Sequence, residues 1–389
     1  MASTLARGVH VQIRIGPLNT RPMSEDLIAD LQEVQVSQSA GQRSGFQLRF
    51  SMARGSRLEG MLAGRELDPP ARVILVVTVD GRPQVLSDGV ITRHDVVRSG
   101  TAGASTLTLT GLDVSQMMDL IDLSGLPMPM PAEAQVYTLL APFSVYGVIP
   151  MVVPSILIFA PNPIERYPSI QGTPYAHLAQ IADDVGYVFY VEPGPQPGMN
   201  IAYWGPEIRA GTSQPALTVN SDVSSNVDSL SFSFDGISKT VYFLTAFPPQ
   251  VKVPIPIPVP DISPMSPPQG RKPIIPLSYK RMNIARHSDG TDKSDDATAR
   301  LDVVQTLARG LARAAQSAQV ITGSGSLEVA RYGRLLRARQ PVDVRGAGLA
   351  YDGTYTVRSV TTTLSPGKAS QQFSLARNAQ VANNGKVQI

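Results

Sequence analysis

Four aspartates, Asp289, Asp292, Asp295 and Asp296, form the densest group of potential cation ligands in the chain. A calcium loop also needs a glycine at its turn and a glutamate at its end, and the pattern lacks both. The four residues precede an amphipathic segment, where carboxylates stabilise the start of a helix through its dipole. We therefore predict that they cap a helix and do not bind a metal.

Two further positions could support acid–base chemistry. Asp183 and Asp184 are adjacent, but neighbouring residues of a helix point apart, so the pair is interpreted as a solvated face. His177 has no carboxylate or second ligand at a matching spacing. We expect it to be a surface or hydrogen-bonded residue.

Arg331, Arg334, Arg337 and Arg339 form the best basic cluster. Single-stranded nucleic-acid sites combine positive charge with stacking aromatics, and few aromatics are interleaved here. The pattern favours a solvated or subunit-facing strand edge over a nucleic-acid groove.

The sequence contains no zinc-protease pair, nucleophile elbow, phosphate loop or calcium loop. It has no cysteine, which excludes disulfides, thiolate zinc sites and cysteine catalysis. We therefore expect no catalytic, cofactor-binding or metal-ligating residues, no cofactor and no small-molecule substrate. A scaffold that fits other protein parts is the more natural interpretation.

Bulk properties agree with this interpretation. A chain of 389 residues exceeds what one core usually organises, so two to four domains are expected. Its 34 cations and 31 acids are too evenly balanced to imply specific nucleic-acid binding. The amino terminus has no apolar signal-peptide core and passes directly into an alternating strand, which predicts cytoplasmic assembly.

Residues 134–164 contain no charged side chain and are long enough to span a bilayer. Prolines and a glycine interrupt the stretch, and no helix of about 20 residues survives them well. We predict a buried, irregular segment in a domain or subunit interface, with no membrane span.

The elements that would position these residues are mainly strands. Turn signals separate short alternating strands over residues 1–112, as in a small antiparallel barrel or sandwich, and a short helix is expected over residues 113–121. The apolar run at residues 72–79 predicts a central strand buried on both faces. Residues 122–228 read as mixed α and β, with a helix capped by Thr173 that ends at Gly186.

The last third begins with alternating strands and then a Pro-rich insert at residues 248–276. Polyproline II structure in a stiff connector is favoured there over a docking ligand for an aromatic groove. An amphipathic helix at residues 296–319 follows. Strands are then predicted at Ser326–Val329, Pro341–Arg345, Gly353–Leu364 and Ala369–Arg377.

The predicted fold is therefore mainly β with an α+β insertion: two related small antiparallel β-barrels and an α/β middle domain. The predicted domains are residues 1–121 (first barrel), 122–228 (insertion), 229–380 (second barrel) and 381–389 (tail).

Three segments together resemble the baseplate hub proteins of contractile phage tails and extracellular injection systems, the late-control D family, which also forms the hub half of type VI spike proteins. They are TPYAHLAQIADDVGYVFYVEP, the approach NPIERYPSIQGTPYAHL, and the terminal pattern GSGSLEV…PVDVRGAG…YDGTYTVRSVTTTLSPGKASQQFSLAR. The resemblance covers most of the chain in order.

The resemblance implies a structural homotrimer whose two barrels per subunit join a sixfold inner tube to a threefold spike. The chain stops after the second barrel, so the resemblance also implies a separate spike protein and other baseplate components as partners. It implies a component of a phage tail or of an injection particle that can be released from the cell.

Two other functions stay open. A carbohydrate- or cell-wall-binding β module would need exposed aromatics, for which Trp204 is the only candidate. A cell-wall hydrolase would need a paired acid and base in a cleft, and the sequence shows none.

Overall fold

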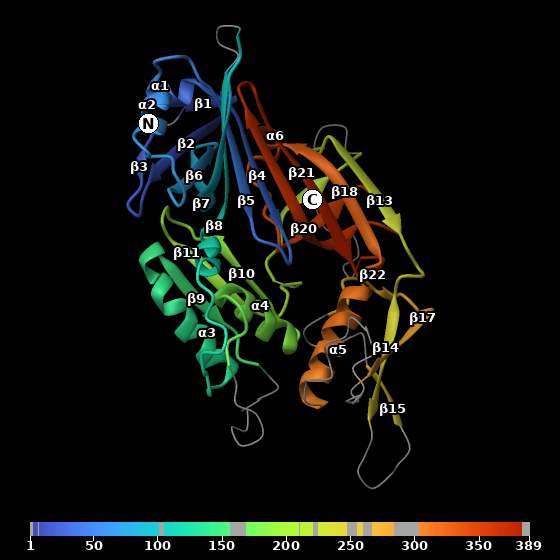
Figure 1. The fold of residues 1–389 in the computed structure, drawn as a ribbon. Helices are drawn as coiled ribbons and strands as arrows, with labels where there is room; N and C mark the ends of the chain where they lie inside the picture. The colour runs from blue at the N-terminus through green and yellow to red at the C-terminus, as the bar shows by residue number, and fades with distance from the viewer. Residues whose placement is uncertain are drawn as a thin grey trace.

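The computed structural model describes residues 3–6, 8–100, 105–155, 169–209, 211–220, 225–246, 255–259, 267–283 and 303–382. Strands are the main regular structure of these residues. They form a 14-stranded sheet, two three-stranded sheets and a two-stranded sheet. The large sheet occupies one end of the molecule, and the other elements lie beyond it (Figure 1).

The first half of the large sheet has the strand order β1-β2-β6-β7-β8-β5-β4. Its apolar residues alternate because each strand turns one face to the core. β6 is buried on both faces, as predicted from its unbroken apolar run, and so is the middle of its neighbour β7. The strands are β1 Ser3–Ala6, β2 Val9–Gly16, β3 Arg21–Pro22, β4 Leu31–Ser39, β5 Gly45–Ser51, β6 Arg72–Val79, β7 Arg82–Val97 and β8 Thr106–Asp113, with helices α1 Glu25–Ala29 and α2 Arg57–Ala63 between them.

The second half continues from β4 through β20, β21 and β18 to β13. β19 extends it by pairing with β20, and β12 pairs with β19. The strands are β12 Gln214–Thr218, β13 Ser229–Phe234, β18 Ile321–Glu328, β19 Pro341–Arg345, β20 Gly353–Ser365 and β21 Lys368–Arg377, and the short helix α6 is Val329–Tyr332.

The expectation of two barrels needs correction. Among the described strands no closed barrel forms, because the two halves are joined edge to edge by antiparallel pairing of β4 with β20. The two halves also share one continuous core, in which Ile13 and Leu48 belong to the same cluster as Tyr355 and Leu375. The mainly β class with helical insertions is confirmed.

The insertion has a core of its own around Val136, Leu178 and Trp204. Thr173 caps α4 as predicted, since its hydroxyl accepts from the Ala176 N–H. The predicted helix at residues 113–121 is a 3-10 helix. The elements are η1 Val114–Asp119, α3 Ala132–Leu140, η2 Ala141–Tyr146, β9 Val148–Val152, α4 Pro174–Asp184, β10 Val188–Pro193 and β11 Asn200–Gly205.

A separate three-stranded sheet packs against α5, and it corrects two predictions about residues 229–283. β14 lies outside the large sheet, whereas its alternation predicts a strand of the second barrel. Part of the Pro-rich insert is strand β15, not polyproline II, and it lies at a sheet edge, where proline costs no ladder hydrogen bond. The elements are β14 Thr240–Ala246, β15 Ile255–Val259, β17 Ser278–Asn283 and α5 Val303–Ser317, with β16 Lys272–Pro273 pairing β22 Ala379–Gln380.

The uncharged stretch at residues 134–164 is only partly buried where the structure describes it. Leu140 and Val148 lie in the insertion core, whereas Val145, Ile149 and Met151 are about half exposed. Residues 156–168 lie outside the described residues. No helix among the described residues is long and apolar enough to cross a membrane.

Candidate functional site

Buried arginines occupy the junction between the large sheet and the insertion. The first is Arg72, at the start of β6, which makes two 2.8 Å hydrogen bonds to the carboxylate of Asp88 on β7. The same guanidinium donates to the carbonyls of Tyr146 and Gly198 in the insertion, at 2.7 and 3.2 Å. Asn200 donates to Asp88 at 3.0 Å, so the ion pair bridges both units.

This ion pair lies out of water, with side-chain exposures of 4% for Arg72 and 0% for Asp88. Burial raises the pKa of the Asp88 carboxyl, while the bonds from Arg72 and Asn200 oppose that shift. A buried charge needs such partners to remain ionised. The pair therefore fixes the insertion against the sheet.

Arg339 forms the second contact, where both sheet halves and the insertion meet. It precedes β19 and donates to the carbonyls of Ser39 and Gln42, each at 2.9 Å. Its guanidinium carbon lies 4.3 Å from the ring centre of Tyr190 on β10 and its Nη1 lies 4.0 Å from Glu192. One side chain thus ties together three parts of the chain.

Arg43, between β4 and β5, forms the third contact. It donates to Asp119 at 2.8 Å, and its guanidinium carbon lies 3.6 Å from the ring centre of Tyr175 on α4. The hydrogen bond from Arg43 is the main cause that lowers the pKa of Asp119.

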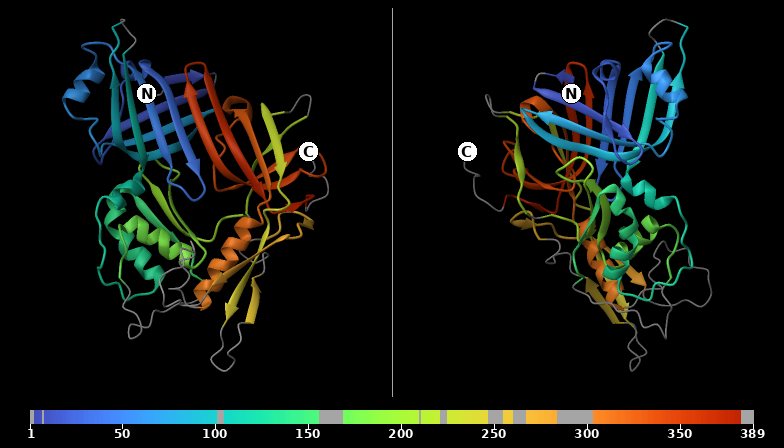
Figure 2. Two further views of the ribbon diagram at one scale, coloured as in Figure 1. Left: turned by 45° about the vertical axis from the view of Figure 1, so that its right-hand side comes forward. Right: turned by 90° about the vertical axis from the view of Figure 1, so that its left-hand side faces the viewer.

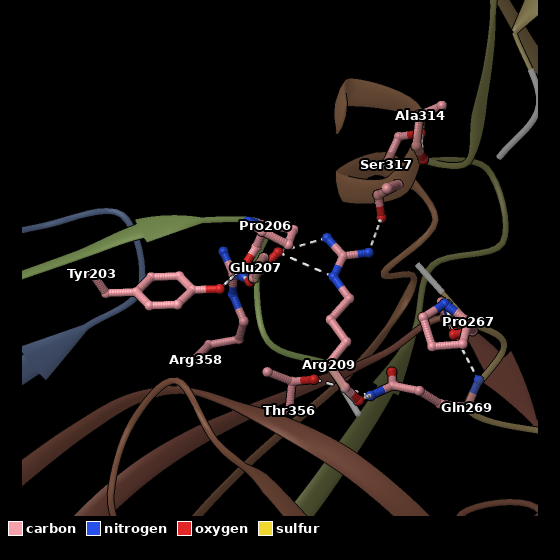
Figure 3. Close-up of polar contacts among 12 residues, drawn as sticks. Tyr203, Pro206, Glu207, Arg209, Pro267, Gln269, Ala314, Ser317, Thr356 and Arg358 are labelled. Carbon is pink, nitrogen blue, oxygen red and sulfur yellow. Dashed lines mark hydrogen bonds and ion pairs between the residues drawn. The ribbon is translucent and has the colours of Figure 1, made fainter. Parts of the chain in front are cut away.

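Arg209 lies in the segment that leaves the insertion after β11 (Figure 3). It donates twice to Glu207 and, at 2.9 Å, to the carbonyl of Ala315 in the last turn of α5. Glu207 also accepts from Arg358 on β20. Gln269 donates to the backbone oxygen of Arg209, at 3.4 Å, so part of the Pro-rich region is bound into the same network.

The predicted strand-edge role of the arginine cluster is wrong for Arg339, because this residue is 6% exposed. The cluster lies on α6 and the loop before β19, not on a strand. Arg331 pairs with Asp228 and Glu328 at the surface, and Arg334 is exposed as predicted. Charge spacing alone could not reveal that Arg339 meets an aromatic ring from another unit.

The remaining residues considered for acid–base or metal chemistry are one histidine and two groups of aspartates. His177 is buried and hydrogen-bonded, with Nε2 2.8 Å from Oε1 of Gln135. Asp183 and Asp184 end α4, while the four aspartates at residues 289–296 lie outside the described residues. Within the described ranges, no group of three His, Cys, Asp or Glu residues could hold a metal ion.

Sequence reasoning missed Arg72, Arg43 and Arg209. For Arg72 the sequence does contain a signal, because this arginine begins the otherwise apolar run RVILVVTV. A charge buried with such a strand needs an oppositely charged partner, which predicts a buried ion pair. Asp88, Asp119 and Glu207 are each held by arginine. The junction is therefore suited to holding these units in fixed positions.

No protein-family model matches the sequence, and no curated protein matches it. Solved structures do. A tail protein from Neisseria meningitidis MC58 has a TM-score of 0.60 at 14% identity, covering 95% of this chain and 97% of that one. The 43 kDa tail protein of prophage MuSo2 from Shewanella oneidensis has a TM-score of 0.59 at 16% identity, covering 95% and 99%.

A type VI secretion system component from E. coli, described as structurally similar to phage T4 tail proteins, has a TM-score of 0.51 at 9% identity and covers 91% of this chain and 76% of its own. The resemblance found in the sequence is thus confirmed at the level of the fold. The chain has the fold of phage-tail and type VI secretion proteins over nearly its whole length.

Proposed function

We propose that the chain is the structural baseplate hub of a contractile injection particle or phage tail. The observation that carries the proposal is the extent of the fold match, 95% of this chain against 97% and 99% of the two bacterial tail proteins. A single shared domain would align over only part of the chain, whereas here the match extends over 95% of it.

The proposed assembly is a homotrimer. Each subunit contributes two sheet halves joined through β4 and β20, so three subunits present six similar units around one axis. A sixfold inner tube can bind the six halves, while a separate threefold spike binds the trimer. The inner tube protein, the spike and other baseplate components are its proposed partners.

The proposed role needs no catalysis, cofactor or small-molecule substrate, and assembly takes place in the cytoplasm before the particle acts outside. The carbohydrate-binding alternative loses its aromatic candidate, because Trp204 is fully buried against Tyr187 in the insertion core. The arginine-bound carboxylates of the junction likewise offer no support for a hydrolase.

Native mass spectrometry of the full chain, alone and mixed with its tube and spike proteins, tests the proposal. We expect a species of three subunits that carries one spike trimer. A chain that remains monomeric with both partners present would overturn the hub assignment. A chain that binds cell-wall glycan as a monomer would support the carbohydrate-binding alternative.

A further inference from the structure

Strand β17 (Ser278–Asn283) has an outer edge with which no described strand pairs. It ends the three-stranded sheet of order β15-β14-β17 and pairs only with β14. This sheet lies beside α5, at the end of the molecule away from the large sheet (Figure 2). An unpaired edge presents a row of backbone N–H and C=O groups, which can bind another extended chain.

Apolar side chains are exposed along this edge. Ile275, Leu277 and Tyr279 occupy alternate positions of β17 and of the segment before it, and they are 78%, 65% and 66% exposed. Alternate residues of an extended chain share one face. The ammonium group of Lys239 donates to the carbonyl of Ile274, which holds the segment before β17 in place. Exposed apolar groups gathered in this way mark interaction sites.

The apolar side chains and the cations of β17 lie on opposite faces of the strand. Tyr242 of β14 packs in the small core that α5 covers, and its register partner on β17 is the exposed Lys280. The next residue of β14, Phe243, turns to the other face, where its ring centre lies 6.0 Å from that of Tyr279. Adjacent positions of the edge therefore offer an apolar group on one face and a cation on the other.

The sequence around this edge is basic, although the whole chain is nearly balanced in charge. Residues 262–288 contain five lysines and arginines and no acid. Two of the lysines, Lys272 and Lys280, are exposed at the two ends of the apolar positions. Lysine on an edge strand discourages pairing with a second copy of the same edge, because like charges would then face each other. The same lysines attract an acidic partner.

Other occupants fit this edge less well. The chain's own acidic stretch at residues 289–296 has four aspartates but no apolar residue to cover Leu277 or Tyr279. Single-stranded nucleic acid needs several stacking aromatics, and Tyr279 is the exposed aromatic on β17. An anionic membrane offers no row of backbone groups to pair with the strand edge.

We propose that this edge surface, made of the free edge of β17 with Ile275, Leu277, Tyr279 and Lys280, binds an extended segment of another protein in which apolar and acidic residues alternate. The segment adds a strand to β17 through backbone hydrogen bonds. Its apolar side chains lie against Leu277 and Tyr279, and its carboxylates lie beside Lys280. The surface is defined without reference to the trimer, so it is tested separately from the proposed function.

Fluorescence anisotropy with the full chain and a labelled peptide of alternating valine and glutamate tests the proposal. We expect binding that weakens as the salt concentration rises. A peptide of the same composition, with valines and glutamates in two blocks, should not bind, because its apolar groups do not share one face. N-methylation of one alternate set of backbone nitrogens should abolish binding, and methylation of the other set should not, because only one edge of the added strand pairs with β17.

Substitutions locate the binding surface. Leu277→Asp should weaken binding by about tenfold, and Lys280→Glu by about fivefold. The matched controls are Leu349→Asp, at a position 89% exposed, and Lys368→Glu, at the exposed start of β21. Neither control should change binding. Circular dichroism verifies the fold of every variant.

Three results would overturn the proposal. The first is failure of the alternating peptide to bind, and the second is an equal effect of the two methylation patterns. The third is binding of phosphatidylserine vesicles or of oligothymidylate, but not of the peptide, that Leu277→Asp and Lys280→Glu abolish; this would assign the surface to a lipid or a nucleic acid. The subunit count from native mass spectrometry is independent of all three, so the hub proposal stands or fails on its own.

Discussion

Replacing Arg72 with methionine removes the cation of the buried pair and keeps an unbranched apolar side chain on β6. Asp88 then remains in a site with 0% exposure and retains only Asn200 as a side-chain donor. Removing one partner of a buried ion pair costs about 3–5 kcal/mol, because the remaining charge is uncompensated. The hydrogen bonds from Arg72 to the carbonyls of Tyr146 and Gly198 are lost as well. We therefore expect the loss of folding free energy to lie toward the upper end of this range.

The expected shift in melting temperature follows from chain length. Cooperative unfolding of 389 residues has an entropy of about 0.8 kcal/mol/K, so about 4 kcal/mol lowers Tm by about 5 °C. Circular dichroism follows the sheet, and fluorescence of Trp204, the single tryptophan, follows the insertion core. The melting temperatures from both signals should fall by the same amount, because the Arg72–Asp88 pair joins the large sheet to the insertion.

The matched control is Arg93→Met. Arg93 also pairs with an aspartate at 2.8 Å, but the two side chains are 72% and 40% exposed. Surface pairs contribute about 0–1 kcal/mol, so its Tm should barely change. Adding Asp88→Asn to Arg72→Met should restore part of the lost stability, because the buried charge is then removed.

The penalty should also depend on pH. Without Arg72, the pKa of Asp88 rises further above its unfolded value, so the folded variant binds a proton that the unfolded chain does not. The variant therefore gains stability as pH falls toward about 4, the ordinary pKa of an aspartate in the unfolded chain, and its deficit should shrink over that fall. Equal effects of Arg72→Met and Arg93→Met at pH 7 would refute the reasoning.

Three further predictions concern other parts of the chain. Gly111→Ala should lower Tm, because a Cβ there would lie 2.2 Å from the Phe46 ring, whereas Gly60→Ala on α2, where a Cβ meets nothing within 4 Å, should leave Tm unchanged or raise it. Burial lowers the pKa of His177 in the folded chain. When the pH falls through about 6.5, the unfolded chain therefore binds a proton at this residue before the folded chain does, and the folded state loses stability. Urea unfolding should show this loss in the wild type and not in His177→Gln. The fragment 278–389 should show no cooperative thermal transition, because it lacks both β4 and β13 and leaves β20 and β18 with unpaired edges.

Alternation and capping predicted the local elements well. The bounds of β6 and β19 agree with the sequence prediction, and Thr173 caps α4. Alternation fixes which face of a strand is buried, but it does not say which strand lies alongside, so the β4–β20 joint was not foreseen. Proline discouraged a strand prediction over β15, although an edge position accommodates it.

The candidate site was less predictable, because its parts come together only in the folded chain. Arg339 is close in sequence to three other arginines that look alike, yet its environment comes from Tyr190 and Ser39. A surface arginine and a buried one cannot be distinguished by spacing.

The joint between β4 and β20 also constrains how the chain is made. Ser37 and Thr361 face each other across 324 positions, so β4 leaves the ribosome long before its partner exists. At about 5–20 residues per second, the wait is on the order of tens of seconds. Throughout that interval β4 offers a bare edge to any neighbouring nascent chain. Crowded polysomes therefore carry a risk of mispairing between copies, and slower initiation or a bound chaperone should raise the yield of correctly folded subunits.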